Sequence, residues 1–383
     1  MTYMKILLLL MFCTVLPMQA QQMKKLTDLK DFEARLLQEA KNIESIESNF
    51  TQIKYLDVFD EKITSKGTFY YKKSNKICMD YAQPMNYLIV INNNQLKIVS
   101  DGKKSIMDLH SNKMMNQMQD MLTACMVGDL SNMSPGYALE YFEDAHYYLI
   151  QIKPVSKAVK AYINQIQIYL DKKDMSVHKL RLSETATNYT EYEFSDKKFN
   201  SLKDEQSLRY ASWLLLLFIL LSCSHRVTGE ATALPPILQA EAQSQKYNLQ
   251  LDFMKHHFSG MLIVRQMPDN EIRILGSTYF GLSLFDFSLH RDTFIVNSCI
   301  EPMRKKKMLK ILETDFKNLF LKSEKARIKK KSSTFEQRIS GKGFGKTVFT
   351  LSGFVNGQAE KVQIKHPLIR LRIQLDKLNI NNP

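Results

Sequence analysis

The sequence offers few residues whose types and spacing could carry out catalysis. The stretch GKGFGKT at 341–347 is similar to the end of a phosphate-binding loop, but Ser340 stands where that pattern needs its first glycine. A strand rather than a helix is predicted after it, so the helix N-terminus that would hold phosphate is missing. His110 and the pair at 256–257 lack partners at metal-ligand spacing. No Ser/His/Asp or paired-carboxylate arrangement stands out. We therefore expect no catalytic residues, no metal, no cofactor and no enzymatic activity.

The five cysteines could carry redox or metal chemistry only with suitable partners. Cys13 lies in the apolar start of the chain and Cys223 ends another apolar run, which leaves Cys78, Cys125 and Cys299. These are too few for a disulfide framework. A Cys78–Cys125 bridge could form in an oxidising compartment, and buried free thiols are the alternative. No C-x-x-C pair supports a zinc or redox site.

Length, charge and the start of the chain suggest an exported protein of two or three domains. The chain has 383 residues, a net charge of +14 and 44% hydrophobic residues, enough for sizeable cores. Positive charge favours anionic partners such as phospholipid headgroups or nucleic acid. A basic start, an apolar core at 6–16 and a break at 17–20 predict a signal peptide over residues 1–20, cleaved after Ala20. Export argues against nucleic acid as a partner.

Residues 21–203 are predicted to form helices and an antiparallel meander. Apolar residues recur at three- and four-residue steps from Leu26 to Ile46, which is typical of one helix face. A second helical stripe of methionines spans 114–126. Alternating and apolar runs predict strands at 50–55, 68–72, 77–81, 87–91, 95–100, 137–142, 147–152, 163–170, 177–182 and 187–194. Short turns between them favour one continuous curved sheet.

These elements resemble the LolA family of periplasmic carriers, which ferry lipoproteins to the outer membrane. The resemblance covers residues 24–203 and rests on the segments 50–52, 67–73, 76–81 with Gln83-Pro84, 166–174, 177–182, 188–190 and 194–199. It implies a half-open β-barrel, an incomplete cylinder of antiparallel strands lidded by helices. Acyl chains of a cargo lipoprotein would lie on its concave apolar face. A carrier must hide these chains, at about 0.8 kcal/mol per buried CH₂, and still release them.

The same resemblance implies a set of site residues. The acyl-chain cavity would be lined by Phe50, Phe69, Tyr71, Ile77, Met79, Tyr81, Met114, Met115, Met118 and Met121. Methionine suits adaptable apolar surfaces, although ordinary core packing is the alternative for this stripe. Lys73 falls where the family carries a basic residue that helps to hold the closed state. The family usually has arginine there, and lysine cannot make the same planar, bidentate contact.

An apolar run in the interior, ASWLLLLFILLSC at 211–223, divides the chain. As a helix it would reach roughly 20 Å, short for a bilayer core of about 30 Å. Its ending, Leu220-Leu221-Ser222-Cys223, resembles a bacterial lipoprotein signal, which makes Cys223 a candidate lipid attachment site. We expect residues 204–223 to mark the junction of two proteins, and the polar residues 224–245 to form a tether. One joined chain and cleavage before Cys223 both remain open.

Residues 246–383 repeat the arrangement of strands, helix and strands. Strands are predicted at 249–253, 258–266, 271–279, 282–289, 293–300, 335–339, 347–354, 359–364 and 369–375, with a helix from Met308 to Phe320. The segments 258–264 and 280–286 resemble LolB, the outer-membrane receptor that accepts cargo from LolA. The fold class is therefore mainly β with α, two half-open antiparallel β-barrels each lidded by helices. The basic helix and the loop predicted after it, 304–331, would be a solvated face or would bind anionic headgroups.

Together these resemblances imply a periplasmic carrier domain joined to an acceptor domain that is lipid-anchored at the outer membrane if Cys223 is processed. The expected partners are acylated lipoproteins or other lipids, an inner-membrane release complex and the outer membrane. One alternative is a carrier of another acylated lipid, a glycolipid or a pigment. The other is a secreted envelope enzyme on a β scaffold, because catalytic residues can converge from distant positions.

Overall fold

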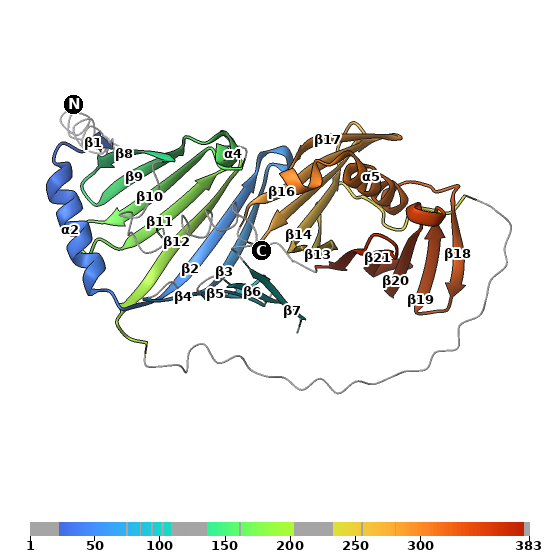
Figure 1. Ribbon diagram of the computed structural model, residues 1–383, viewed down its shortest axis with the longest axis horizontal. Helices are drawn as coiled ribbons and strands as arrows, with labels where there is room; N and C mark the ends of the chain where they lie inside the picture. Colours follow the sequence, from blue (N-terminus) through green and yellow to red (C-terminus); the bar gives the residue numbers. More distant parts are fainter. Residues whose placement is uncertain are drawn as a thin grey trace, which may run out of the picture.

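The computed structural model describes residues 23–73, 76–84, 86–92, 95–100, 103–108, 124, 136–160, 162–202, 233–253, 256–279 and 281–378. Two large antiparallel sheets dominate these residues, one from each half of the chain, and they lie next to each other (Figure 1). Both sheets are open, consistent with half-barrels, and each half has one long helix. The predicted fold class, mainly β with α, is confirmed.

The first sheet has twelve strands in the order β1-β8-β9-β10-β11-β12-β2-β3-β4-β5-β6-β7. Its strands are β1 (Lys24–Lys25), β2 (Ser45–Leu56), β3 (Glu61–Lys72), β4 (Lys76–Gln83), β5 (Tyr87–Asn92), β6 (Gln95–Ser100), β7 (Lys103–Asp108), β8 (Tyr137–Glu143), β9 (Tyr147–Pro154), β10 (Gln165–Asp171), β11 (Val177–Ser183) and β12 (Tyr189–Phe199). Two meanders, β2–β7 and β8–β12, join where β12 pairs with β2. The sheet curves strongly, so that β4–β7 turn away from the plane of β8–β12 (Figure 1).

Helix α2 (Leu29–Asn42) crosses the end of the first sheet (Figure 1). The side chain of Asp28 caps its N-terminus by accepting a hydrogen bond from the backbone N–H of Asp31 at 3.0 Å. Phe32 is its buried anchor, with its ring 4.8 Å from that of Tyr148. The helix ends before Ile43, which is extended, so it is shorter than the predicted periodic stretch. A short helix, α4 (Lys157–Lys160), follows β9.

The second sheet has ten strands in the order β17-β16-β15-β14-β13-β22-β21-β20-β19-β18. Its elements are β13 (Gln245–Phe253), β14 (His256–Gln266), β15 (Ile272–Thr278), β16 (Ser283–His290), β17 (Thr293–Cys299), α5 (Lys306–Phe320), β18 (Ala326–Lys331), β19 (Phe335–Ser340), β20 (Thr347–Val355), β21 (Gln358–His366) and β22 (Leu371–Lys377). Here too a second meander closes on the first, because β22 pairs with β13. This shared topology supports the prediction that the halves are structural repeats.

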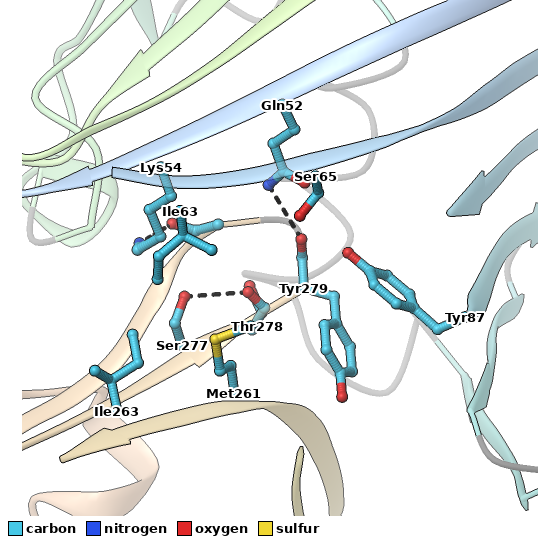
Figure 2. A pocket seen from close by; sticks show the side chains of 11 residues that line it. Gln52, Lys54, Ile63, Ser65, Tyr87, Met261, Ile263, Ser277, Thr278 and Tyr279 are labelled. Carbon is cyan, nitrogen blue, oxygen red and sulfur yellow. Dashed lines mark hydrogen bonds between the residues drawn. The ribbon is translucent and has the colours of Figure 1, made fainter. Parts of the chain in front are cut away.

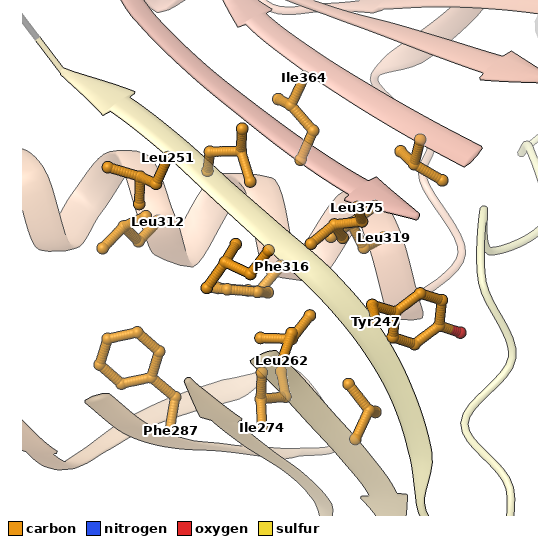
Figure 3. Close-up of a cluster of buried hydrophobic side chains, with 14 of the residues drawn as sticks. Tyr247, Leu251, Leu262, Ile274, Phe287, Leu312, Phe316, Leu319, Ile364 and Leu375 are labelled. Carbon is orange, nitrogen blue, oxygen red and sulfur yellow. The ribbon is translucent and has the colours of Figure 1, made fainter. Parts of the chain in front are cut away.

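The core of the second domain lies between α5 and its sheet. Leu312, Phe316 and Leu319 of α5 face apolar side chains of the strands, among them Ile274 and Phe287 (Figure 3). These positions follow the three- and four-residue spacing of one helix face, as predicted. The lysines at the start of α5 lie on its exposed side.

Two segments differ from the prediction for the second half. The basic loop predicted after α5 contains β18, which pairs only with β19 and forms an edge of the sheet. Residues 233–244, counted above with the tether, pack on the second domain: Leu238 is buried and its N–H donates to the carbonyl of Leu319 at 2.8 Å. Within the described residues, no helix is long and apolar enough to cross a membrane.

Candidate functional site

An aromatic row crosses the face of the first sheet that packs against Phe32 of α2, here called the inner face. The register pairs Phe194 of β12 with Phe50 of β2, and it pairs Tyr81 of β4 with Tyr87 of β5. Gly67 of β3 lies between Phe50 and Tyr81 and pairs with both. Directly paired residues project from the same face of a sheet, so these four rings form one row across five strands.

Gly67 allows the two central rings of this row to meet. A Cβ atom at Gly67 would lie 2.1 Å from the carbonyl oxygen of Asp80 and 2.9 Å from Cζ of Phe50. With glycine there, the rings of Phe50 and Tyr81 meet edge to face, with centroids 4.8 Å apart and an interplanar angle of 78°. Tyr81 in turn stacks on Tyr87 at 4.0 Å. Aromatic pairs in these geometries are stabilised by more than the burial of their apolar area alone.

The other cavity residues predicted from the first half lie on the same inner face. Phe69 pairs with Met79, Tyr71 pairs with Ile77, and all four are buried in one cluster with the aromatic row. The structure thus brings together Phe50, Phe69, Tyr71, Ile77, Met79 and Tyr81. They pack against one another, and their role in binding acyl chains stays a prediction.

The aromatic row of the inner face is uncharged. Burial raises the pKa of Tyr81, Tyr87 and Tyr192 well above that of an ordinary tyrosine, so all three phenols stay neutral at physiological pH. A neutral apolar surface of this kind can hold hydrocarbon. Among the residues that the structure describes, no group of three or more His, Cys, Asp or Glu side chains could hold a metal ion.

A small cavity lies where the inner face reaches the second domain, and we call this place the mouth. Figure 2 shows β2 and β3 of the first domain on one side and β14 and β15 of the second on the other. The cavity is lined by Gln52, Lys54, Ile63, Ser65, Tyr87, Met261, Ile263, Ser277, Thr278, Tyr279 and Gly281. Its volume of about 30 Å³ has room for one or two water molecules and none for an acyl chain.

Polar groups of the first domain hold the connection between β15 and β16 at this mouth. Lys54 Nζ and Thr190 Oγ1 both donate to the carbonyl oxygen of Gly281, the latter at 3.0 Å. Gln52 Nε2 donates to the carbonyl oxygen of Tyr279 at 3.3 Å (Figure 2). Lys54 also forms an ion pair with Glu184 at 2.9 Å, and both side chains are about nine-tenths buried. The mouth is therefore a contact between the domains that buried hydrogen bonds and a buried ion pair stabilise.

Lys73, the predicted latch, lies at the rim between α2 and the end of β3. Its Nζ atom is 2.5 Å from Oε1 of Glu44 and donates to the carbonyl oxygen of Lys41 at 3.4 Å. Both side chains of the ion pair are at least half exposed. An exposed pair of this kind contributes only about 0–1 kcal/mol. The latch therefore remains a prediction.

The remaining predicted site residues fall outside the described residues. These are Ala20, Met114, Met115, Met118, Met121 and Cys223. Of the two cysteines for which a bridge and free thiols both remained open, Cys78 is a buried free thiol and Cys125 lies outside the described residues. Burial raises the pKa of Cys78 to about 12.

Two groups of residues that complete this region could not be assigned to it from the sequence. Tyr87 and Phe194 belong to predicted strands, and their pairing with Tyr81 and Phe50 could have marked them as members of the row. Lys54, Glu184 and Thr190 carried no such signal, because isolated polar residues on strands or in the turns between them usually face solvent.

Comparison with known proteins bears on the first half of the chain. Residues 41–206 match the family model of the outer membrane lipoprotein carrier protein LolA. The match spans β2 to β12, so this half has a LolA-like fold and is called the LolA-like domain below. It ends at residue 206, and the resemblance of residues 246–383 to LolB therefore stays a prediction.

Several solved structures share low similarity with the chain. A LolA superfamily protein from Nitrosomonas europaea is 11% identical, with a TM-score of 0.25, over 44% of this chain and 94% of that one. The Pseudomonas aeruginosa MucA/MucB complex is 11% identical, with a TM-score of 0.30, over 91% and 93%. The lipoprotein LppX of Mycobacterium tuberculosis is 10% identical, with a TM-score of 0.24, over 45% and 94%. No curated protein matches the chain.

Proposed function

We propose that the LolA-like domain is a periplasmic carrier that binds the acyl chains of lipoproteins on its inner face. The observation that carries this proposal is the family match over residues 41–206, the span that builds the aromatic row. The row and the neighbouring Met79 and Ile77 supply the apolar surface for the chains. Binding would make and break no covalent bond.

The physical chemistry of the inner face suits this role. Each CH₂ group that leaves water gains about 0.8 kcal/mol, and neutral phenol rings add apolar area without placing a charge against the chain. Methionine side chains such as Met79 also tolerate ligands of irregular shape. Such a surface recognises hydrocarbon rather than one headgroup, so lipoproteins are proposed from the family match and not from a specific polar contact.

We propose further that the second domain acts as the acceptor at the outer membrane, on the resemblance of residues 258–264 and 280–286 to LolB. Transfer would run toward the domain that holds acyl chains more tightly. The partners would be acylated lipoproteins, the complex that releases them from the inner membrane, and the outer membrane itself.

The test is a binding measurement with two matched ligands on the full chain. A synthetic diacylated lipopeptide and the same peptide without acyl chains would each compete with a fluorescent palmitoyl probe. Only the lipopeptide should displace the probe. Met79→Gln, which keeps side-chain size and adds a buried amide, should weaken probe binding. The control Asp80→Asn changes the next residue of β4, which is exposed, and should leave binding unchanged.

Two results would contradict the proposal. Displacement by the unacylated peptide would show recognition of the peptide rather than of hydrocarbon. Equal probe affinity in Met79→Gln, Asp80→Asn and the unaltered chain would place the acyl site away from the inner face. Circular dichroism of each variant confirms that the sheets remain folded.

A further inference from the structure

Two side chains from the turn between β15 and β16 of the second domain, Tyr279 and Leu282, lie in the hydrophobic cluster of the LolA-like domain. Tyr279 and Leu282 are 4% and 6% exposed and belong to the cluster formed by the inner face. The ring of Tyr279 stacks on Tyr87 with centroids 4.1 Å apart, and this extends the aromatic row by one ring from the other domain (Figure 2). The end of the row is thus covered by the second domain.

The LolA-like domain also forms hydrogen bonds to the backbone of this turn. The carbonyl oxygens of Tyr279 and Gly281 accept hydrogen bonds from Gln52, Lys54 and Thr190. The amide of Ser283 donates to both carboxylate oxygens of Glu184, at 3.2 and 3.3 Å. These bonds are made by side chains of the first domain to the main chain of the second.

Gly281 is required by this fit. Its φ of +83° lies in the region that only glycine adopts readily. A Cβ atom there would lie 2.2 to 2.8 Å from atoms of the Thr190 side chain. The main chain at Gly281 therefore packs directly against the Thr190 side chain of β12, with no space for a Cβ atom between them.

We propose that Tyr279, Gly281 and Leu282, in the turn between β15 and β16, are a plug for the mouth of the LolA-like domain, and that an acyl chain enters only after the plug withdraws. This inference rests on the proposed acyl-binding function. With the plug in place, the mouth retains a cavity of only about 30 Å³, whereas withdrawal of Tyr279 and Leu282 would free the end of the aromatic row. Ligand binding is thereby coupled to separation of the domains at this contact.

Tyr279 and Leu282 pack in the first hydrophobic cluster and not in the second, so their removal takes no side chain from the hydrophobic core of the second domain. The Tyr279 hydroxyl also donates to Oδ1 of Asn248 in β13, and both the alanine variant and the phenylalanine control lose this bond, so the comparison isolates the ring. The experiment compares the unaltered full chain with Tyr279→Ala/Leu282→Ala and with the control Tyr279→Phe, which keeps the stacking ring. A second variant, Lys54→Met, loosens the clamp from the LolA-like side. Affinity for the palmitoyl probe and deuterium exchange of residues 278–283 are measured for each.

We expect the double alanine variant to bind the probe at least tenfold more tightly than the unaltered chain, with Lys54→Met changed in the same direction and Tyr279→Phe unchanged. Saturating probe should also speed exchange in residues 278–283 of the unaltered chain. Equal affinities in all four proteins, or exchange in the turn that does not respond to bound probe, would overturn the plug and leave acyl binding standing. If no protein binds the probe, the proposed function and the plug both fail, and faster exchange in the variants would then identify a purely structural contact.

Discussion

Replacing His366 by leucine is expected to destabilise the second domain by about 3–5 kcal/mol, because the substitution strands a buried carboxylate. His366 Nε2 lies 2.7 Å from Oδ2 of Asp315, and both side chains are almost fully buried. Nδ1 of His366 lies 3.3 Å from Oγ1 of Thr347. The cluster therefore links α5 to β20 and β21 through the core of the domain.

The magnitude follows from what remains after the substitution. Within the described residues, Oδ1 of Asp315 has no hydrogen-bond partner and Oδ2 has His366, so His366→Leu leaves the carboxyl group without its partner. A loss of about 3–5 kcal/mol lowers the folding equilibrium constant by roughly two to four orders of magnitude. The double variant Asp315→Leu/His366→Leu removes both groups, and it should recover most of this loss since apolar replacements of buried pairs are often neutral or stabilising.

The pH dependence gives an independent check. Burial raises the pKa of Asp315 above its ordinary value of 3.8, while His366 opposes this rise. Between the unfolded and the raised pKa the native state binds more protons than the unfolded state, so stability falls as pH increases through that window. Loss of His366 should raise the pKa of Asp315 further. The destabilisation by His366→Leu should therefore be smaller in mild acid than at neutral pH.

The assay is urea denaturation followed by far-UV circular dichroism at several pH values, with His290→Leu as the control. His290 lies partly exposed at the end of β16 and should tolerate the change. A loss below about 1 kcal/mol for His366→Leu would mean that the cluster is hydrated or weakly coupled. If the loss of stability caused by His366→Leu increased as the pH was lowered, a charged Asp315 would not be its cause.

Three further outcomes follow from close packing and burial. Gly67→Ala should lower the free energy of unfolding by about 1–3 kcal/mol or more in urea denaturation, because the added Cβ would clash with the main chain of β4. The control Gly345→Ala should be neutral, because a Cβ there meets nothing within 4 Å. Equal effects of the two substitutions would refute the close approach at Gly67. Cys78, with a pKa of about 12 against the ordinary 9.0, should react with iodoacetamide roughly a thousandfold more slowly than in urea, measured by peptide mapping. Lys246 and Glu61 form a buried ion pair of 2.6 Å between the domains. In a double-mutant cycle on the free energy of unfolding, Lys246→Met and Glu61→Gln should therefore be strongly non-additive. Additive losses of stability would show that this ion pair does not hold the domains together.

Much of both sheets could be predicted because apolar alternation follows directly from burial on one face. Phe69, Tyr71, Ile77, Met79 and Tyr81 alternate along two strands, and the structure places all of them on the inner face. The alternation also determines register, because a slip by one residue would turn this whole set toward solvent.

β18 could not be predicted because its sequence, ARIKKK, has only two alternating apolar residues, Ala326 and Ile328, before a run of lysines. An edge strand pairs on one side only, and its lysines remain hydrated while they discourage pairing with another chain. Its identity as a strand comes from its hydrogen bonds to β19 rather than from its own side chains. Exposed lysines suit both a solvated face and the binding of anionic headgroups, so both predictions for the basic segment stay open.

The contact between the halves could not be predicted because its residues are ordinary in their local context. Residues 278–283 look like any turn between two strands, and the lysine and glutamate that hold it are about 230 and 100 residues away in sequence. What distinguishes the contact is complementary burial: the pairs Lys54–Glu184 and Lys246–Glu61 both lie where the two sheets meet. Removing one partner of a buried pair is costly, so such a surface selects one docking geometry over others. The halves are therefore matched to each other by the groups that they bury, whether the chain stays joined or is cut before Cys223.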